Sequence, residues 1–199
     1  MDRDTCLLCG ERGHRAKDCP NRGNAGAQGD RRRAFNSFVG APNDDKPRQF
    51  EEDDDFVGFS LEECKGYALL DGGASRSVGG VEQLEHVNDG LEKPMKVSMD
   101  QSLGFTFAGG DRAEAPSRVS FAVKDLDDEK VEIFVLDRPS PVLLGIDMLK
   151  RYELVIDYGR NTVYSHKLKK NIPAKILTCG HLAINLTALG NAGPSSSRE

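Results

Sequence analysis

The chain has 199 residues, of which 27 are Lys or Arg and 32 are Asp or Glu, so its formal net charge is −5. This acidic balance excludes a nucleic-acid surface that covers the whole chain, and no apolar run reaches the about 20 residues of a membrane span. The charge is uneven, because residues 1–33 hold eight basic against five acidic side chains and the remainder holds 19 against 27. We therefore expect contact with a polyanion only at the N-terminal arm, and no membrane partner.

The first candidate unit, residues 1–22, carries three cysteines and one histidine in the spacing Cys-x2-Cys-x4-His-x4-Cys. Three thiolates and one imidazole complete a tetrahedral shell around zinc and leave no position open for a substrate. Gly10 and Gly13 permit the tight turns that so short a chain needs around one ion. The pattern predicts one structural zinc ion, held by Cys6, Cys9, His14 and Cys19.

The segment from Cys6 to Pro20 resembles the CCHC zinc knuckle of retroviral and retrotransposon nucleocapsid proteins. The resemblance implies binding of single-stranded RNA or DNA, with bases stacked on the residues at the positions of Leu7 and Ala16. Neither residue is aromatic, so we expect weak, salt-sensitive binding with little sequence preference. A protein partner is the alternative. The side chains that would contact phosphates are Arg12, Arg15, Lys17 and Arg22.

Residues 23–63 are predicted to be a disordered linker, because their polar and acidic composition buries too little apolar surface to offset the entropy of ordering. Of the five cysteines in the chain, Cys64 and Cys179 are left over from the zinc site and are far apart in sequence. Free thiols are typical of a reducing compartment. We therefore expect an intracellular location, cytoplasmic or nuclear.

Residues 64–170 show short apolar runs separated by Gly, Asp and Pro, which predicts a small, mainly β domain. One short helix is expected near its C-terminus, over Ile146–Tyr152, where Met148, Leu149 and Tyr152 recur at helical spacing. The expected strands are Tyr67–Leu70, Val97–Met99, Gly104–Ala108, Arg118–Lys124, Lys130–Leu136, Pro141–Gly145, Leu154–Asp157 and Thr162–Ser165.

Residues 171–199 are interpreted as a partly disordered tail. Leu182, Ile184 and Leu186 alternate with small or polar residues, which favours a strand. That strand would either join a sheet between two subunits or lie at the edge of the chain's own sheet.

The strand Tyr67–Leu70 runs directly into Asp71, followed by Gly72, Gly73 and Ala74. Glycines after the carboxylate let backbone N–H groups approach it. Two such aspartates brought together by a two-fold axis cannot both ionise, so they would share a proton and activate a water molecule. A second feature, Val142-Leu-Leu-Gly145, follows about seventy residues later in the chain.

Together these motifs resemble the retropepsin family, the dimeric aspartic proteases of retroviruses and LTR retrotransposons, over roughly residues 64–166. The resemblance implies a closed β fold, a homodimer that cleaves a polyprotein or peptide with an Asp71 pair, and the Gag–Pol order of knuckle and protease. It also implies a flap at Ala108, Gly109 and Gly110.

One departure limits the resemblance, because Gly72 stands where the family has Ser or Thr. The missing hydroxyl removes a hydrogen bond, worth about 0.5–1.5 kcal/mol, that would support the catalytic turn. Two hypotheses remain. The domain is an endopeptidase, or it is a catalytically impaired scaffold beside a zinc-dependent nucleic-acid-binding knuckle. For Asp147 we expect a structural role at the short helix, and for Asp157 a role in a hairpin.

Overall fold

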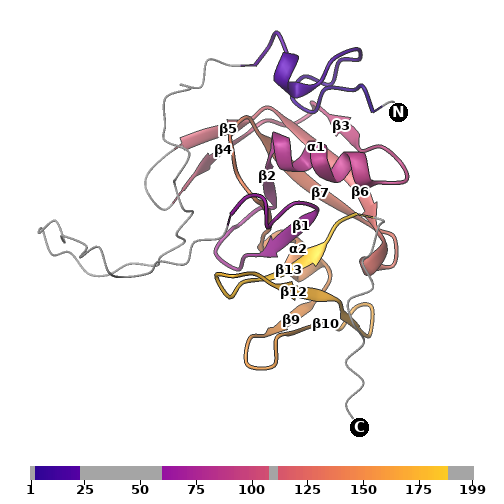
Figure 1. Ribbon diagram of the computed structural model, residues 1–199, viewed down its shortest axis with the longest axis vertical. Helices are drawn as coiled ribbons and strands as arrows, with labels where there is room; N and C mark the ends of the chain where they lie inside the picture. The colour runs from indigo at the N-terminus through magenta and orange to yellow at the C-terminus, as the bar shows by residue number, and fades with distance from the viewer. Residues whose placement is uncertain (1–2, 23–59, 108–111, 188–199) are drawn as a thin grey trace, which may run out of the picture.

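The computed structural model describes residues 3–22, 60–107 and 112–187. In these residues the zinc-knuckle segment lies at one end of a mainly β domain, which confirms the predicted fold class (Figure 1). The described strands form an eight-stranded sheet, a three-stranded sheet and a two-stranded sheet. No described helix is long and apolar enough to cross a membrane.

The large sheet runs, in spatial order, through β12 (Ala174–Ile176), β13 (Leu182–Asn185), β1 (Tyr67–Leu70), β8 (Val142–Leu144), β2 (Val78–Gly80), β7 (Glu129–Leu136), β6 (Ser117–Val123) and β3 (Lys96–Ser98). The three-stranded sheet consists of β9 (Leu154–Asp157), β10 (Thr162–Ser165) and β11 (Lys170–Ile172). The two-stranded sheet pairs β4 (Leu103–Thr106) with β5 (Arg112–Ala115). The helices are α1 (Val81–Gly90) and α2 (Ile146–Arg151), with short 3-10 turns at Ala16–Asp18 and Lys124–Leu126.

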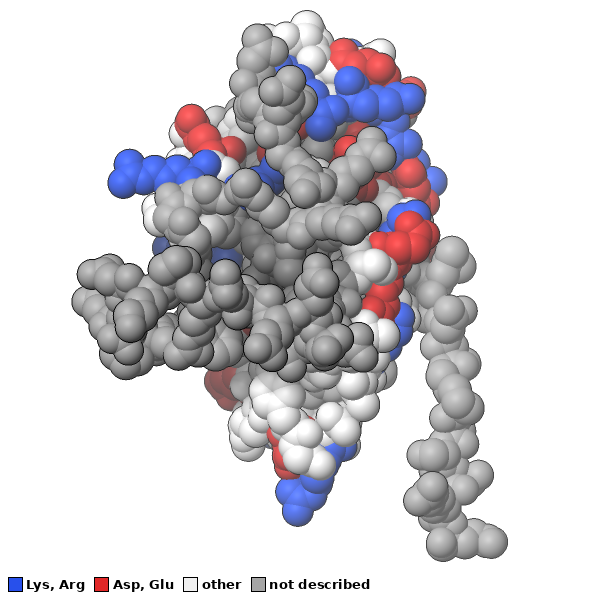
Figure 2. Space-filling view, turned by 60° about the vertical axis from the view of Figure 1, so that its left-hand side comes forward, with Lys and Arg blue, Asp and Glu red and all other residues white. Residues whose placement is uncertain are grey.

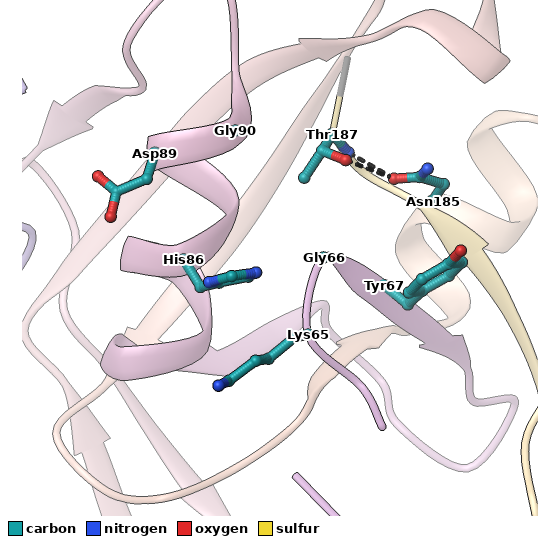
Figure 3. Close-up of a pocket in the computed structure, with 8 residues that line it drawn as sticks. All are labelled: Lys65, Gly66, Tyr67, His86, Asp89, Gly90, Asn185 and Thr187. Atoms are coloured by element: carbon teal, nitrogen blue, oxygen red, sulfur yellow. Dashed lines mark hydrogen bonds between the residues drawn. The ribbon is translucent and has the colours of Figure 1, made fainter. Parts of the chain in front are cut away.

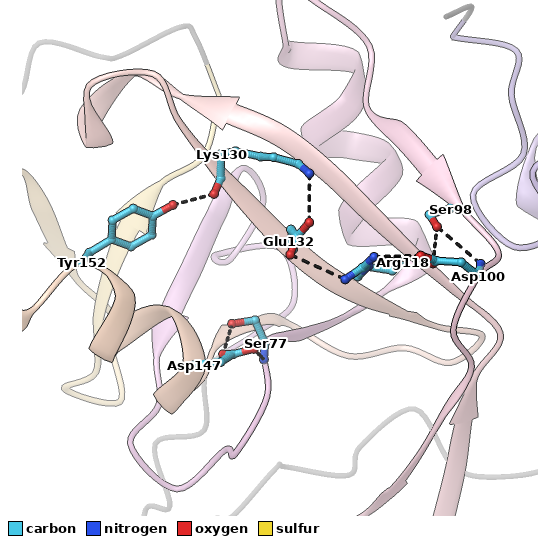
Figure 4. Close-up of polar contacts among 8 residues, drawn as sticks. All are labelled: Ser77, Ser98, Asp100, Arg118, Lys130, Glu132, Asp147 and Tyr152. Carbon is cyan, nitrogen blue, oxygen red and sulfur yellow. Dashed lines mark hydrogen bonds and ion pairs between the residues drawn. The ribbon is translucent and has the colours of Figure 1, made fainter.

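The longest pairing is the hairpin of β6 and β7, whose two strands were predicted as Arg118–Lys124 and Lys130–Leu136. Val119, Val131 and Ile133 are fully buried in the core, whereas the opposite face carries a chain of polar contacts. In that chain Glu132 lies between Lys130 and Arg118, and Arg118 reaches Asp100 (Figure 4). One apolar and one charged face fix the register of the hairpin.

Strand β1 lies between two partners that come much later in the sequence. It pairs parallel with β8, where Leu69 lies opposite Leu143, and antiparallel with β13, where Leu69 lies opposite Ala183. Ala68, Leu69 and Leu70 are buried, which is expected for a strand covered on both faces. This pairing places the end of β1, and therefore Asp71, beside the turn between β8 and α2.

The strand expected around Leu182, Ile184 and Leu186 in the C-terminal segment is present as β13. Residues 171–187 are folded, and β13 lies inside the large sheet between β1 and β12. Leu182, Ala183 and Ile184 are fully buried. Strand β13 therefore belongs to the chain's own sheet, but it is not an edge strand, because β12 pairs with it on the side away from β1. Residues 188–199 lie outside the described part.

Helix α1 was not predicted from the sequence, in which we expected only the one short helix near the C-terminus of the domain. Its buried face is made by Val81, Leu84 and Val87, and it packs on β2 and β7. The helix follows Gly80, where a side chain would lie 2.6 Å from the backbone oxygen of Arg138. The glycine thus permits the close approach of the end of β2, where α1 begins, to the connection between β7 and β8.

Candidate functional sites

The four predicted zinc ligands come together in the knuckle. Their ligand atoms all lie within 4.8 Å of one another, and Cys9 Sγ is 3.3 Å from His14 Nε2. A turn closed by the Gly10 N–H and the Cys6 carbonyl at 2.9 Å carries the first two cysteines. Gly10 and Gly13 have φ of +73° and +94°, so both adopt the left-handed conformations for which glycine was expected.

These residues fit a structural zinc ion. Cys6 and Cys19 are buried and Cys9 and His14 are partly buried, so the protein itself supplies a closed set of three thiolates and one imidazole. Burial raises the pKa of the Cys6 thiol to about 12, and zinc must displace this proton to bind. Metal binding therefore weakens as the pH falls.

Comparison with known protein families finds the zinc knuckle family over residues 4–21. This match includes all four ligands, so the chain contains a CCHC zinc knuckle with one structural zinc site. Knuckles of this type suggest zinc-dependent binding of nucleic acid. Comparison with curated proteins finds no significant match to the chain.

The two residues expected to stack on bases are not on the free surface. Leu7 and Ala16 are only 2% and 1% exposed, and both belong to the hydrophobic core that includes residues of the β domain. The Leu7 carbonyl accepts a hydrogen bond from the Ser117 hydroxyl, and the Ala16 N–H donates to Glu85 at 2.9 Å. In this arrangement neither side chain is available as a platform for a base.

The four basic side chains expected to contact phosphates differ in whether they bind carboxylates of the β domain. Arg15 binds Asp89 at 3.0 Å and lies 3.6 Å from Glu85, and Arg22 binds Asp137 at 2.8 Å. The hydrogen bond with Asp89 is the main reason why the pKa of Arg15 is raised. Arg12 and Lys17 are exposed. Figure 2 shows basic and acidic side chains next to one another over the upper part of the molecule, at the level of the knuckle.

Asp71 directly follows β1 and lies in a turn held by backbone contacts. Its N–H donates to the Leu144 carbonyl at 3.0 Å, and its Oδ1 accepts from the Gly73 N–H at 2.7 Å. The Ile146 N–H donates to the Ala74 carbonyl at 2.8 Å, which ties the end of the turn to the start of α2. The half-buried carboxylate therefore has a defined position at the C-terminal end of β1.

A buried polar network supports this turn. The Ser77 hydroxyl donates to Asp147 Oδ1 at 2.8 Å and accepts from the Gly145 N–H at 3.0 Å, while the Ser77 N–H donates to Asp147 Oδ2 at 3.1 Å (Figure 4). Asp147 thus has the structural role that we expected. Ser77 was missed, because a serine after a turn has no sequence pattern of its own. Asp157 accepts from the Arg160 N–H within its hairpin, also as expected.

Gly72 is exposed, and an added Cβ would have nothing within 4 Å. Its φ is not in the left-handed region, so a serine at this position meets no backbone strain. The expected flap residues Ala108, Gly109 and Gly110 lie outside the described part of the chain.

A hollow of about 350 Å³ lies between the C-terminal half of α1, the start of β1 and the end of β13 (Figure 3). Its walls include His86, Asp89 and Asn185, and Asn185 accepts hydrogen bonds from Thr187. Gly90 permits the close approach of α1 to Thr187, because a side chain there would lie 2.9 Å from the threonine methyl group. The hollow includes neither the zinc ligands nor Asp71.

Proposed function

We propose that the chain binds single-stranded RNA or DNA through its zinc-loaded knuckle. The observation that carries this proposal is the CCHC zinc site within a zinc knuckle match over residues 4–21. Arg12 and Lys17 supply exposed positive charge beside the metal. Because the contacts are mainly with phosphates, the affinity falls steeply as salt rises and differs little between sequences.

The test is binding of a fluorescein-labelled oligonucleotide to the full chain, followed by fluorescence anisotropy at several salt concentrations. Zinc-loaded protein binds, and Cys9→Ser protein, which lacks one ligand, does not. Replacement of both Arg12 and Lys17 by Gln reduces the slope of log K against log salt by about 1.4, since each phosphate contact to a single strand contributes about 0.7. Binding that is independent of zinc, or unaffected by salt, would refute this function.

As a second function we propose that the β domain is an aspartic endopeptidase that acts as a homodimer on a peptide or polyprotein. This proposal is supported by the placement of Asp71, whose carboxylate is half-exposed at the end of β1 and oriented by the Gly73 N–H. It also rests on the sequence resemblance to retropepsins over residues 64–166.

In this proposal two Asp71 carboxylates face each other across a two-fold axis and share one proton. The ionised carboxylate removes a proton from a bound water, which attacks the scissile carbonyl carbon, while the protonated carboxyl group donates its proton to the carbonyl oxygen. The resulting diol collapses with transfer of a proton to the leaving nitrogen. Cleavage is therefore highest at acid pH, where the pair carries one proton.

The experiment compares wild type, Gly72→Ser and Asp71→Asn on a peptide library, over a range of protein concentrations. Wild type cleaves in a concentration-dependent and pepstatin-sensitive manner, Gly72→Ser cleaves faster, and Asp71→Asn is inactive but folded. The serine meets no steric obstacle, since an added Cβ at residue 72 has open space. Activity in Gly72→Ser alone would show that the domain is a disabled scaffold, and cleavage by Asp71→Asn would refute the assignment of the pair.

We also propose an intracellular location, cytoplasmic or nuclear. Outside the zinc site, the described cysteines Cys64 and Cys179 are free thiols. Zinc thiolates and free cysteines persist in a reducing compartment.

A further inference from the structure

The surface of the knuckle that would receive a nucleic acid is covered by the chain's own β domain. The side chains of Leu7 and Ala16 are buried in a core that also contains Val119 of β6 and Met95. The knuckle turn lies close to the segment after β3, because a Cβ at Gly10 would be 3.3 Å from Met99 Cγ. The apolar part of this knuckle surface is therefore buried in an intramolecular contact with the β domain.

The polar part of the same surface is matched by carboxylates of the β domain. Glu85 and Asp89 lie one turn apart on α1, so both face the knuckle. Glu85 accepts from the Ala16 N–H and Asp89 binds the guanidinium of Arg15. Asp137, which follows β7, binds Arg22. A carboxylate offers arginine and backbone N–H groups the same anionic oxygen pair that a phosphate offers.

Two of these carboxylates are largely buried. The side chains of Glu85 and Asp137 are 16% and 15% exposed, so their hydrogen bonds are made in surroundings that are largely closed to water. The hydroxyl of Ser117 and the guanidinium of Arg3 add contacts to the carbonyls of Leu7 and Leu91. The contact thus combines apolar burial with five polar links, which come from different segments of the β domain.

We propose that α1, β3 and Asp137 of the β domain compete with single-stranded nucleic acid for the same face of the knuckle, so that binding requires the knuckle to undock. This inference rests on the proposed nucleic-acid function. The docked form holds Leu7, Ala16, Arg15 and Arg22 away from the ligand. The measured affinity is then the intrinsic affinity of the free knuckle multiplied by the fraction of chains that are undocked.

The test uses the full zinc-loaded chain and a fluorescein-labelled oligouridine of about 20 nucleotides, longer than the about 4–16 nucleotides that a small single-strand-binding domain covers. The opening variant carries Glu85→Gln and Asp89→Asn. A matched control carries Asp127→Asn and Glu129→Gln, which remove two carboxylates paired with Lys170 and Lys167 at the far end of the β6–β7 hairpin. Both variants change the net charge equally, so non-specific attraction of RNA rises equally.

We expect the opening variant to bind the RNA about tenfold more tightly than the control, because it loses one partly buried hydrogen bond to a carboxylate and one exposed ion pair. Hydrogen exchange gives a second readout. The amide of Ala16 is protected in wild type by its bond to Glu85, and it exchanges faster in the opening variant and when RNA is added to wild type.

Equal affinity of the two variants, together with measurable binding, would overturn the competition and leave the nucleic-acid function intact. RNA binding to wild type without faster exchange at Ala16 would also overturn it. If no variant binds RNA although the Ala16 amide of the opening variant exchanges fast and zinc is retained, the proposed nucleic-acid function itself fails, and the competition with it.

Discussion

Replacement of Ser77 by Ala is expected to destabilise the β domain more than the loss of a buried hydroxyl normally does. Ser77 is fully buried and links its own segment to the start of α2, because its side chain contacts both Asp147 and Gly145. The substitution removes one donor to a carboxylate and leaves the N–H of Gly145 without its acceptor. The bond from the Ser77 N–H to Asp147 remains.

The magnitude follows from these contacts. A hydrogen bond to a charged group contributes about 1.5–3 kcal/mol, and a buried N–H without a partner costs about 1–3 kcal/mol. Because Asp147 keeps two N–H donors, from Ser77 and Met148, we take the lower part of these ranges and expect a loss of about 3 kcal/mol. Ser165→Ala is the matched control. Ser165 is equally buried and also accepts from an N–H, that of Leu168, but its hydroxyl donates to the neutral carbonyl of Tyr152. A loss of about 1.5 kcal/mol is therefore expected, from the lower ends of the ranges for a neutral hydrogen bond and for an N–H without its partner.

Urea unfolding of the zinc-saturated chain, followed by far-UV circular dichroism, measures both losses. The slope of free energy against urea must stay constant between variants for the comparison to hold. Equal losses for the two serine variants would refute the special role given to the Asp147 carboxylate. So would additive effects of Ser77→Ala and Asp147→Asn in a double-mutant cycle, since residues in one network are coupled.

Two further predictions concern metal and pH. One zinc ion binds per chain, and His14→Ala or Cys9→Ser abolishes it and exposes the knuckle to proteolysis, as metal analysis and limited digestion will show; a stoichiometric ion in either variant would contradict the ligand set. Burial raises the pKa of Tyr152 to about 12, whereas the pKa of a tyrosine in the unfolded chain is about 10. The neutral phenol therefore contributes fully to the unfolding free energy below pH 10, and this contribution is lost as the pH rises towards 12. Tyr152→Phe should remove this part of the pH dependence of the unfolding free energy, and an unchanged profile would disprove it.

The local features could be predicted from the sequence because their determinants are local. The zinc ligands lie within one short segment, and ligand type and spacing define a tetrahedral site without reference to the rest of the chain. The β6–β7 hairpin follows from two adjacent apolar runs separated by the short polar segment 125–129. Helix α1 had a detectable pattern too, since Val81, Leu84 and Val87 recur at three-residue spacing, but it was not among the predicted elements.

The long-range features could not be predicted from the sequence. Nothing local shows that β13 pairs with β1, because strand order depends on which distant partners meet in the fold. The contact between the knuckle and the β domain could not be predicted for the same reason. Arg15 and Arg22 were interpreted as contacts for phosphate, and only the folded chain places Asp89 and Asp137 beside them. Whether an arginine is free or paired is decided by residues far away in the sequence.

The position of β1 between β8 and β13 has a consequence for synthesis on the ribosome. Ala68 is made early, whereas its partners Val142 and Ile184 emerge only after most of the described chain has been translated. Pairing across such long separations is slow, and an unpaired apolar strand can associate with other nascent chains. The knuckle, in contrast, needs only its own residues and zinc. A nascent chain would therefore carry a finished metal site, with Leu7 and Ala16 still uncovered, well before the turn of Asp71 is held in place.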